Sequence, residues 1–137
     1  MESRVDKATE RHQKGYNCAQ AVACTYADLV GMDEAAMFKV TEGFGAGMGS
    51  MDGTCGAVSG ACALAGMLSS CGDLNNPNSK GATYKLSRAI LNEFKGANGS
   101  VVSKELKGVE TGKVLRSCPD CIRDAARLAE KVLFEDK

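Results

Sequence analysis

The sequence is poor in aromatic residues and has no excess of charge of either sign. Tryptophan is absent, aromatic residues make up 5% of the chain, and 17 basic residues balance 17 acidic ones. With so few rings, we expect a core of small side chains on helices that approach one another closely. The balanced charge gives no electrostatic reason to expect nucleic acid, a polyanion or an anionic membrane as a partner.

Targeting and membrane signals are also missing. The N-terminus, Met-Glu-Ser-Arg-Val-Asp, has no apolar signal region and no twin-arginine pair, so we expect a cytoplasmic protein. The most apolar stretch, residues 57–68, is short and rich in glycine, whereas a bilayer span takes about 20 apolar residues. The length and the lack of repeats predict a single domain over residues 1–137.

Strand signals are weak, and capping residues and glycines divide the chain into helices. The fold class we predict is all-α: a compact orthogonal or bundle-like array of about six to seven helices around a small-residue central helix. That central helix is residues 55–70, which are rich in glycine and alanine. Residues 43–49, with glycine at every second position, should form a loop, because glycine is costly in a helix. The other helices are predicted over 3–14, 18–30, a third one capped by Asp33, 80–95, 100–106 and 118–134.

Cysteine is the residue type that stands out. In a cytoplasmic chain, cysteines indicate redox chemistry, metal binding or buried thiols that act as small apolar residues. Three of them directly follow a predicted helix cap, so each should occupy the first helical position, where free N–H groups and the helix dipole favour the thiolate. The seven cysteines are Cys18, Cys24, Cys55, Cys62, Cys71, Cys118 and Cys121, and those after caps are Cys18, Cys55 and Cys118.

Other motifs narrow the chemistry. Cys118-Pro-Asp-Cys121 is a C-x-x-C at a predicted helix start, which brings two sulfurs within bonding or metal-bridging reach. No good strand precedes it, so a thioredoxin fold is disfavoured. Ile122 follows Cys121 where a covalent c-type haem would need histidine, and a zinc ribbon would need a second C-x-x-C. The only histidine, His12, lies on a polar helix and is expected to be solvated.

Several segments closely resemble the C_GCAxxG_C_C family, whose members have about this length and are named for four characteristic cysteines. The resemblance covers nearly the whole chain and rests on Asn17-Cys18-Ala-Gln-Ala-Val22, Gly43-Phe-Gly-Ala-Gly-Met-Gly49, Thr54-Cys55-Gly-Ala-Val-Ser-Gly60-Ala, and Cys118 with Ile122-Arg-Asp-Ala-Ala126. It implies a helical cysteine-based redox or metal module. Carried over by position, the family cysteines are Cys18, Cys55 and Cys118, while Ser103 stands at the third cysteine position and Cys121 could substitute for it.

Three hypotheses follow. The first is a thiol-disulfide oxidoreductase or redox carrier with an unknown redox partner, in which Cys55 attacks and Cys18 or Cys118 resolves, while Cys121 can resolve Cys118 locally. The second is a module that binds a transition metal or an iron–sulfur cluster through Cys18, Cys55, Cys118 and Cys121. The third is a helical interaction protein without chemistry, and small-residue faces on the central helix would permit a homodimer.

The remaining features have plainer interpretations. Cys24, Cys62 and Cys71 are expected to be buried small hydrophobes. The glycine loop could cradle an anion or cofactor, but we favour a tight crossing between helices that needs positive φ angles. Met48 and Met51 could be soft metal ligands, yet methionine more often fills gaps in a core. No Ser/His/Asp or paired-carboxylate arrangement supports hydrolytic catalysis.

Overall fold

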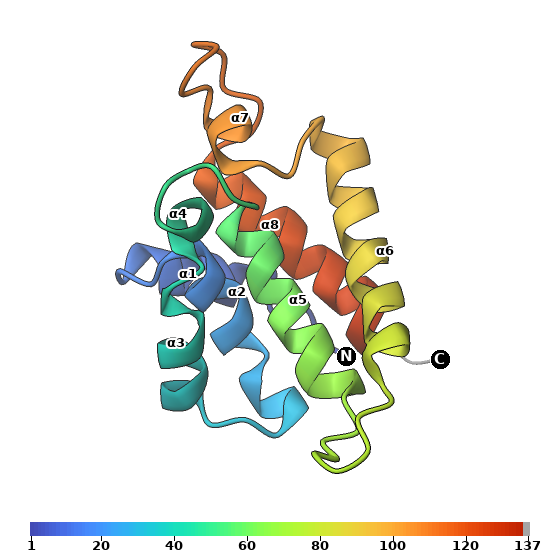
Figure 1. The fold of residues 1–137 in the computed structure, drawn as a ribbon. Helices are drawn as coiled ribbons and strands as arrows, with labels where there is room; N and C mark the ends of the chain where they lie inside the picture. Colours follow the sequence, from blue (N-terminus) through green and yellow to red (C-terminus); the bar gives the residue numbers. More distant parts are fainter. Residues whose placement is uncertain (136–137) are drawn as a thin grey trace.

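The computed structural model describes residues 1–135, and these residues form helices and connecting loops (Figure 1). The all-α prediction is confirmed: within residues 1–135 the only β-type pairing is an isolated bridge between Thr54 and Val102. None of the helices in this part of the chain combines the length and apolar character needed to cross a membrane. The α-helices are α1 (Val5–Gln13), α2 (Cys18–Thr25), α3 (Glu34–Glu42), α4 (Gly45–Met48), α5 (Gly56–Ser69), α6 (Lys80–Asn98), α7 (Ser103–Lys107) and α8 (Cys118–Ala129); η1 (Ala27–Val30) is a 3-10 turn and η2 (Glu130–Phe134) a π-helical turn.

Helix α5 is the central element, as its small residues predict. It packs against α2, α6 and α8, which surround it in Figure 1. Gly60 shows how close the approach is, because a Cβ atom at this position would lie 2.5 Å from the carbonyl oxygen of Ala19 on α2. Ala57, Ala61 and Ala65 are fully buried on the same helix. Small side chains therefore set the spacing of the core, and few rings are needed to fill it.

The helix starts differ from the predictions at three places. Helix α1 begins at Val5 instead of Ser3. Cys55 is the N-cap of α5 rather than its first residue, so the expected cap at Thr54 is wrong by one position. Helix α7 begins at Ser103 and has Val102 as its N-cap, so Ser100 does not cap it directly. Ser100 instead accepts a hydrogen bond from the Val102 N–H and donates one to Glu105, which folds the approach to α7.

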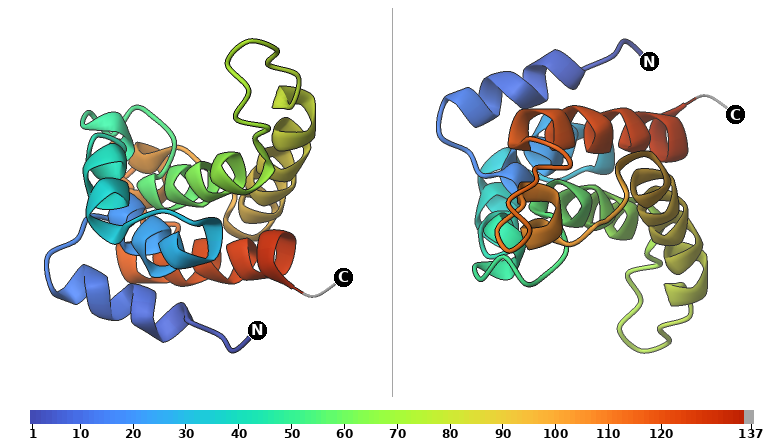
Figure 2. Two further views of the ribbon diagram at one scale, coloured as in Figure 1. Left: turned by 90° about the horizontal axis from the view of Figure 1, so that it is seen from below. Right: turned by 90° about the horizontal axis from the view of Figure 1, so that it is seen from above.

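The glycine segment is a tight crossing, although it contains one short helical turn where a loop was predicted. Within α4, Ala46 and Gly47 have φ angles of 52° and 58°, in the left-handed region that favours glycine. A Cβ atom on Gly45 would lie 2.5 Å from the side chain of Asn17, so glycine is required where the segment crosses the start of α2. Figures 1 and 2 show α4 beside α7 at one end of the molecule, near the start of α8.

Candidate thiol site

Cys18 and Cys118 are the first residues of α2 and α8, as predicted. The side chain of Asn17 accepts a hydrogen bond from the Gln20 N–H at 2.9 Å, and Gln20 bonds back to the Asn17 N–H to complete a capping box. At the start of α8, the Ser117 hydroxyl accepts the Asp120 N–H. Each cap fixes the first helical turn and places the sulfur beside the positive end of a helix dipole.

Cys55 is held just before α5 by the connection that leads into α7. Its N–H donates to the carbonyl oxygen of Val101 at 2.6 Å, next to the Thr54–Val102 bridge. The side chain is 1% exposed. The N–H groups of Ala57 and Val58, in the first turn of α5, stabilise negative charge on its sulfur. The shifted helix start thus keeps the cysteine in the electrostatic setting that the sequence suggested.

The four candidate cysteines form two pairs, and each pair joins two helices. The Cys18 thiol donates a hydrogen bond to the Cys118 sulfur, which links α2 to α8. Cys121 and Cys55 are hydrogen-bonded to each other, which links α5 to α8, and the Cys121 thiol also lies 3.9 Å from the carbonyl oxygen of Arg116. The two cysteines of the C-x-x-C motif, one helical turn apart, therefore each contact a partner on another helix.

Lys107, the last residue of α7, places a positive charge between the two pairs. Its Nζ lies 3.5 Å from the Cys121 Sγ and 3.5 Å from the carbonyl oxygen of Arg116. Burial lowers the pKa of this half-buried ammonium, but its interactions with the sulfurs of Cys121, Cys118 and Cys55 together raise it by more. Lys107 is therefore charged, and it favours the thiolate form of the cysteines around it.

Within the first pair, Cys118 is the thiolate and Cys18 the thiol. The hydrogen bond from Cys18 lowers the pKa of Cys118 to about 5 against the effect of burial, and the charges of Lys107 and His12 lower it further. Donating that bond, together with burial, raises the pKa of Cys18. Cys118 has the lower thiol pKa of the two because of its hydrogen bond with Cys18, because it is less buried and because His12 lies near it, whereas Lys107 lowers the pKa of both.

The second pair has the same asymmetry but a weaker one. The hydrogen bond from Cys121 lowers the pKa of Cys55 to about 7, although burial opposes the shift. The pKa of Cys121 is raised, first by the bond it donates to Cys55 and then by burial. The buried pair therefore carries a less acidic thiolate than the pair that contains Cys118.

A cavity of about 250 Å³ lies at these helix starts, with Cys18, Cys118 and Cys55 at its wall and Cys121 buried behind it. Sequence reasoning missed two of its residues. His12 is half-buried and lines the cavity, whereas its polar helix predicted a solvated side chain. Lys107 is one of 17 basic residues and no motif distinguishes it. The lining residues are His12, Asn17, Cys18, Ala46, Met51, Cys55, Gly56, Ser103, Lys107 and Cys118.

Ser103 and Met51 contact each other in this cavity. The Ser103 hydroxyl donates to the Met51 Sδ at 3.7 Å, and Ser103 is 3% exposed. The position that the family resemblance assigns to a third cysteine therefore lies in the same cavity as the thiol pairs. Serine here cannot form a disulfide, so this position takes no part in thiol exchange.

The other three cysteines lie elsewhere. Cys24 is buried as predicted, and burial raises its pKa to about 11. Cys62 is half-buried on α5. Cys71 is exposed in the loop between α5 and α6, so its predicted burial is wrong. The prediction failed because α5 ends at Ser69, before this cysteine, and the residues that follow, through Ser79, form a surface loop.

The arrangement of the cysteines does not fit a metal centre. Within residues 1–135, no group of three or more histidine, cysteine, aspartate and glutamate side chains is positioned to hold a metal ion. A structural zinc site or an iron–sulfur cluster takes about four such ligands around one point. Two separate sulfur pairs suit thiol–disulfide exchange better than metal coordination.

Comparison with known proteins identifies the family of this helical, cysteine-bearing chain. Residues 16–132 match the model of the family described as "Putative redox-active protein (C_GCAxxG_C_C)". The chain belongs to this family, which confirms the resemblance recognised in the sequence. No curated protein and no solved structure matches the chain.

Proposed function

We propose that this protein is a thiol–disulfide redox protein in which Cys118 is the attacking thiolate and Cys18 the resolving thiol. The observation that carries the proposal is that Cys18 and Cys118, at the starts of α2 and α8, line one cavity together with Lys107. The sequence favoured Cys55 for the attack, but that side chain is 1% exposed, whereas Cys118 is half-buried. An attacking sulfur has to be both ionised and accessible, and Cys118 meets both conditions better.

The exchange takes two steps. The Cys118 thiolate attacks one sulfur of a substrate disulfide R–S–S–R′, forms a Cys118–S–S–R bond and releases R′–S⁻, which takes a proton from solvent. Cys18 loses its proton to solvent and attacks the Cys118 sulfur, which closes the Cys18–Cys118 disulfide and releases R–S⁻. The protein loses two electrons and the substrate gains two. Each step is reversible, so the direction depends on the reduction potential of the partner.

The Cys55–Cys121 pair provides a second two-electron couple behind the first. Cys121 lies one turn after Cys118 on α8, at the spacing that lets two cysteines form a bond. A thiolate at Cys121 can attack Cys118 in the first disulfide and release Cys18. Cys55 can then attack Cys121, which frees Cys118 and leaves a Cys55–Cys121 disulfide. The outer pair is thereby returned to its reduced form while the buried pair is oxidised.

Trapping the disulfides tests the proposal. The reduced protein is purified anaerobically, oxidised with diamide, quenched in acid and mapped by alkylation and mass spectrometry. We expect Cys18–Cys118 and Cys55–Cys121 disulfides that dithiothreitol reverses. Cys18→Ser combined with Cys121→Ser removes both thiols that can resolve Cys118, and should leave Cys118 as a mixed disulfide with added glutathione. The matched variant Cys62→Ser should keep both protein disulfides.

Two results would contradict the proposal. In the first, Cys18 and Cys118 remain thiols while the exposed Cys71 is oxidised, so that the hydrogen-bonded pair is inert. In the second, metal analysis of the same anaerobic sample finds a stoichiometric ion that protects the cysteines from alkylation until a chelator is added. The second result would establish the ligand role instead.

A further inference from the structure

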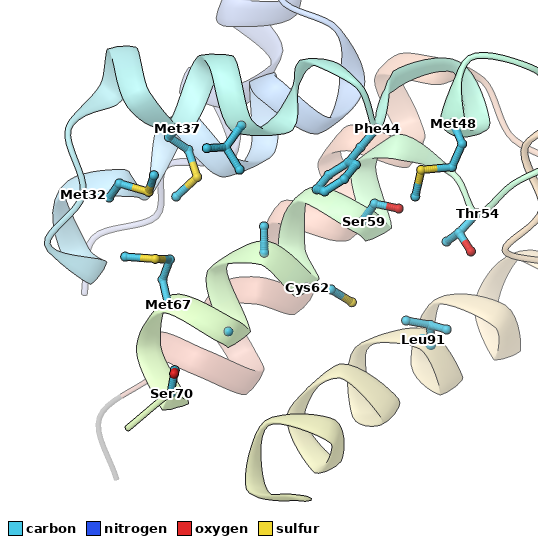
Figure 3. A pocket seen from close by; sticks show the side chains of 13 residues that line it. Met32, Met37, Phe44, Met48, Thr54, Ser59, Cys62, Met67, Ser70 and Leu91 are labelled. Carbon is cyan, nitrogen blue, oxygen red and sulfur yellow. The ribbon is translucent and has the colours of Figure 1, made fainter. Parts of the chain in front are cut away.

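A second and larger cavity lies between α3, α5 and α6, and Thr54 lines it while the next residue, Cys55, lines the thiol cavity. Its volume is about 710 Å³, inside the range of roughly 300–1,000 Å³ that is usual for small-molecule sites. Figure 3 shows α5 forming its floor, with methionines and Phe44 around it and Leu91 of α6 facing them. Nothing in the proposed thiol exchange uses this cavity.

The floor of the cavity is hollow because one face of α5 has small side chains. Ser59, Ala63 and Gly66 follow one another at intervals of four and three residues, so they lie on the same face of the helix. A Cβ atom added at Gly66 would meet no other atom within 4 Å. Elsewhere on α5, at Gly60, a neighbouring backbone fills the space, so the hollow belongs to this face alone.

Methionine is the most frequent residue type in the wall of this cavity. Four of the six methionines in the chain line the cavity, namely Met32, Met37, Met48 and Met67. Met37 is 1% exposed at the base, whereas Met48 and Met67 are 50% and 42% exposed at the rim. Flexible, polarisable thioether side chains can adapt to the shape of an apolar ligand. A bound ligand would cover the apolar surface that is now open at the rim.

The polar groups of the cavity include two hydroxyls at one end. Figure 3 shows the hydroxyls of Thr54 and Ser59 at the end nearest Met48, away from Met32 and Met67. In this protein the helical hydroxyls of Thr25 and Thr41 each donate to the carbonyl four residues earlier, at 2.7 Å. Within residues 1–135, the hydroxyls of Thr54 and Ser59 make no hydrogen bond to protein, so both are available to a ligand.

The cavity has no charged lining residue in the described part of the chain. A charged group bound here would lose its hydration without gaining a partner of opposite charge, which costs several kcal/mol. We propose that this cavity binds an uncharged, mostly apolar small molecule whose single carbonyl or hydroxyl group hydrogen-bonds to Thr54 and Ser59. The proposal goes beyond the thiol chemistry and does not depend on it.

Nile red, an uncharged apolar dye with a ring carbonyl, is a suitable probe. Titration into the reduced full-length protein should give saturable, blue-shifted emission at one dye per chain. Gly66→Leu places a side chain in the hollow and should weaken binding about ten-fold or more, because the dye and the new side chain need the same space. The matched variant is Gly96→Leu on α6, where a Cβ atom also meets nothing within 4 Å, and it should bind the dye as the wild type does.

The polar end is tested separately. Ser59→Ala combined with Thr54→Val should weaken Nile red binding about three- to ten-fold, the usual size of one lost hydrogen bond. Equal binding to the wild type and to Gly66→Leu would overturn the proposal. Sedimentation velocity on the same samples provides a further check: a wild-type dimer that Gly66→Leu converts to monomer would show that the cavity is an interface between copies of this chain, and would also overturn it.

Discussion

Replacing Lys107 by methionine should raise the pKa of Cys118, because it removes the charge and keeps most of the side chain. Lys107 also hydrogen-bonds to the Cys118 sulfur, and two unit charges about 3.5 Å apart interact by about 5 kcal/mol at an effective dielectric constant of 20. Lys107 is half-buried and the cavity is open to water, so we take between a quarter and a half of this value. The expected increase is about 1–2 pKa units, at about 1.4 kcal/mol per unit.

Alkylation rates measured against pH give this value directly. Each cysteine is labelled with iodoacetamide for short times between pH 4 and 10 and quantified by mass spectrometry. We expect Cys118 in the wild type to react with a midpoint close to its pKa of about 5, the midpoint to rise in Lys107→Met, and Lys107→Arg to preserve it. Lys104→Met is the control on the same helix, since Lys104 pairs with Asp52 and Glu110 instead. An unchanged midpoint in Lys107→Met, or an equal change in Lys104→Met, would refute the reasoning.

Three further predictions concern packing, pH and the serine in the thiol cavity. In urea titration, Gly60→Ala should lower the free energy of unfolding by about 2–3 kcal/mol, because its Cβ meets the Ala19 carbonyl. Gly66→Ala on the same helix should raise it by about 0.5–1 kcal/mol, because its Cβ meets nothing within 4 Å and alanine is the better helix former. The pKa of Cys118 is about 5 in the folded chain and 9.0 as a free thiol, so the unfolded chain binds more protons between pH 5 and pH 9. The free energy of unfolding of the reduced wild type, measured relative to Cys118→Ser, should therefore increase from pH 5 to pH 9 and stop increasing above pH 9. Ser103→Cys adds a fourth cysteine to the cavity and should bind Co²⁺ at least about ten-fold more tightly than the wild type, detected by thiolate-to-metal absorption. Equal affinity would show that the new sulfur points away.

Much of the fold could be predicted because it depends on local signals. Asn17 and Ser117 are strong caps, and each begins its helix where the sequence places the start. The small residues of α5 require a close neighbour, which made its central position predictable. Thr54 failed as a cap because its backbone pairs with Val102, a contact between residues 48 positions apart that no local pattern contains.

The pairing of the thiols was less predictable, for the same physical reason. Spacing along one helix shows that Cys118 and Cys121 are close, but not which helix start each of them faces. That depends on how α2 and α5 pack against α8. Lys107 reaches the site only because α7 lies across the helix starts, and a lysine after a short polar stretch gives no such indication.

The charge beside Cys118 should also determine whether the outer pair acts as an oxidant or a reductant. A Cys18–Cys118 disulfide would close a loop of roughly 100 residues, which in the chain-entropy treatment favours the disulfide by about 4–5 kcal/mol in the folded chain. A stabilised thiolate favours the reduced state, and oxidation leaves the half-buried Lys107 without that thiolate as a partner. Each unit by which Lys107 lowers the pKa of Cys118 should therefore make the midpoint potential of the Cys18–Cys118 couple at pH 7 more positive by about 30 mV. Lys107→Met should make the potential about 30–60 mV more negative in a glutathione titration, and a change in the opposite direction would mean that the ammonium stabilises the disulfide form instead.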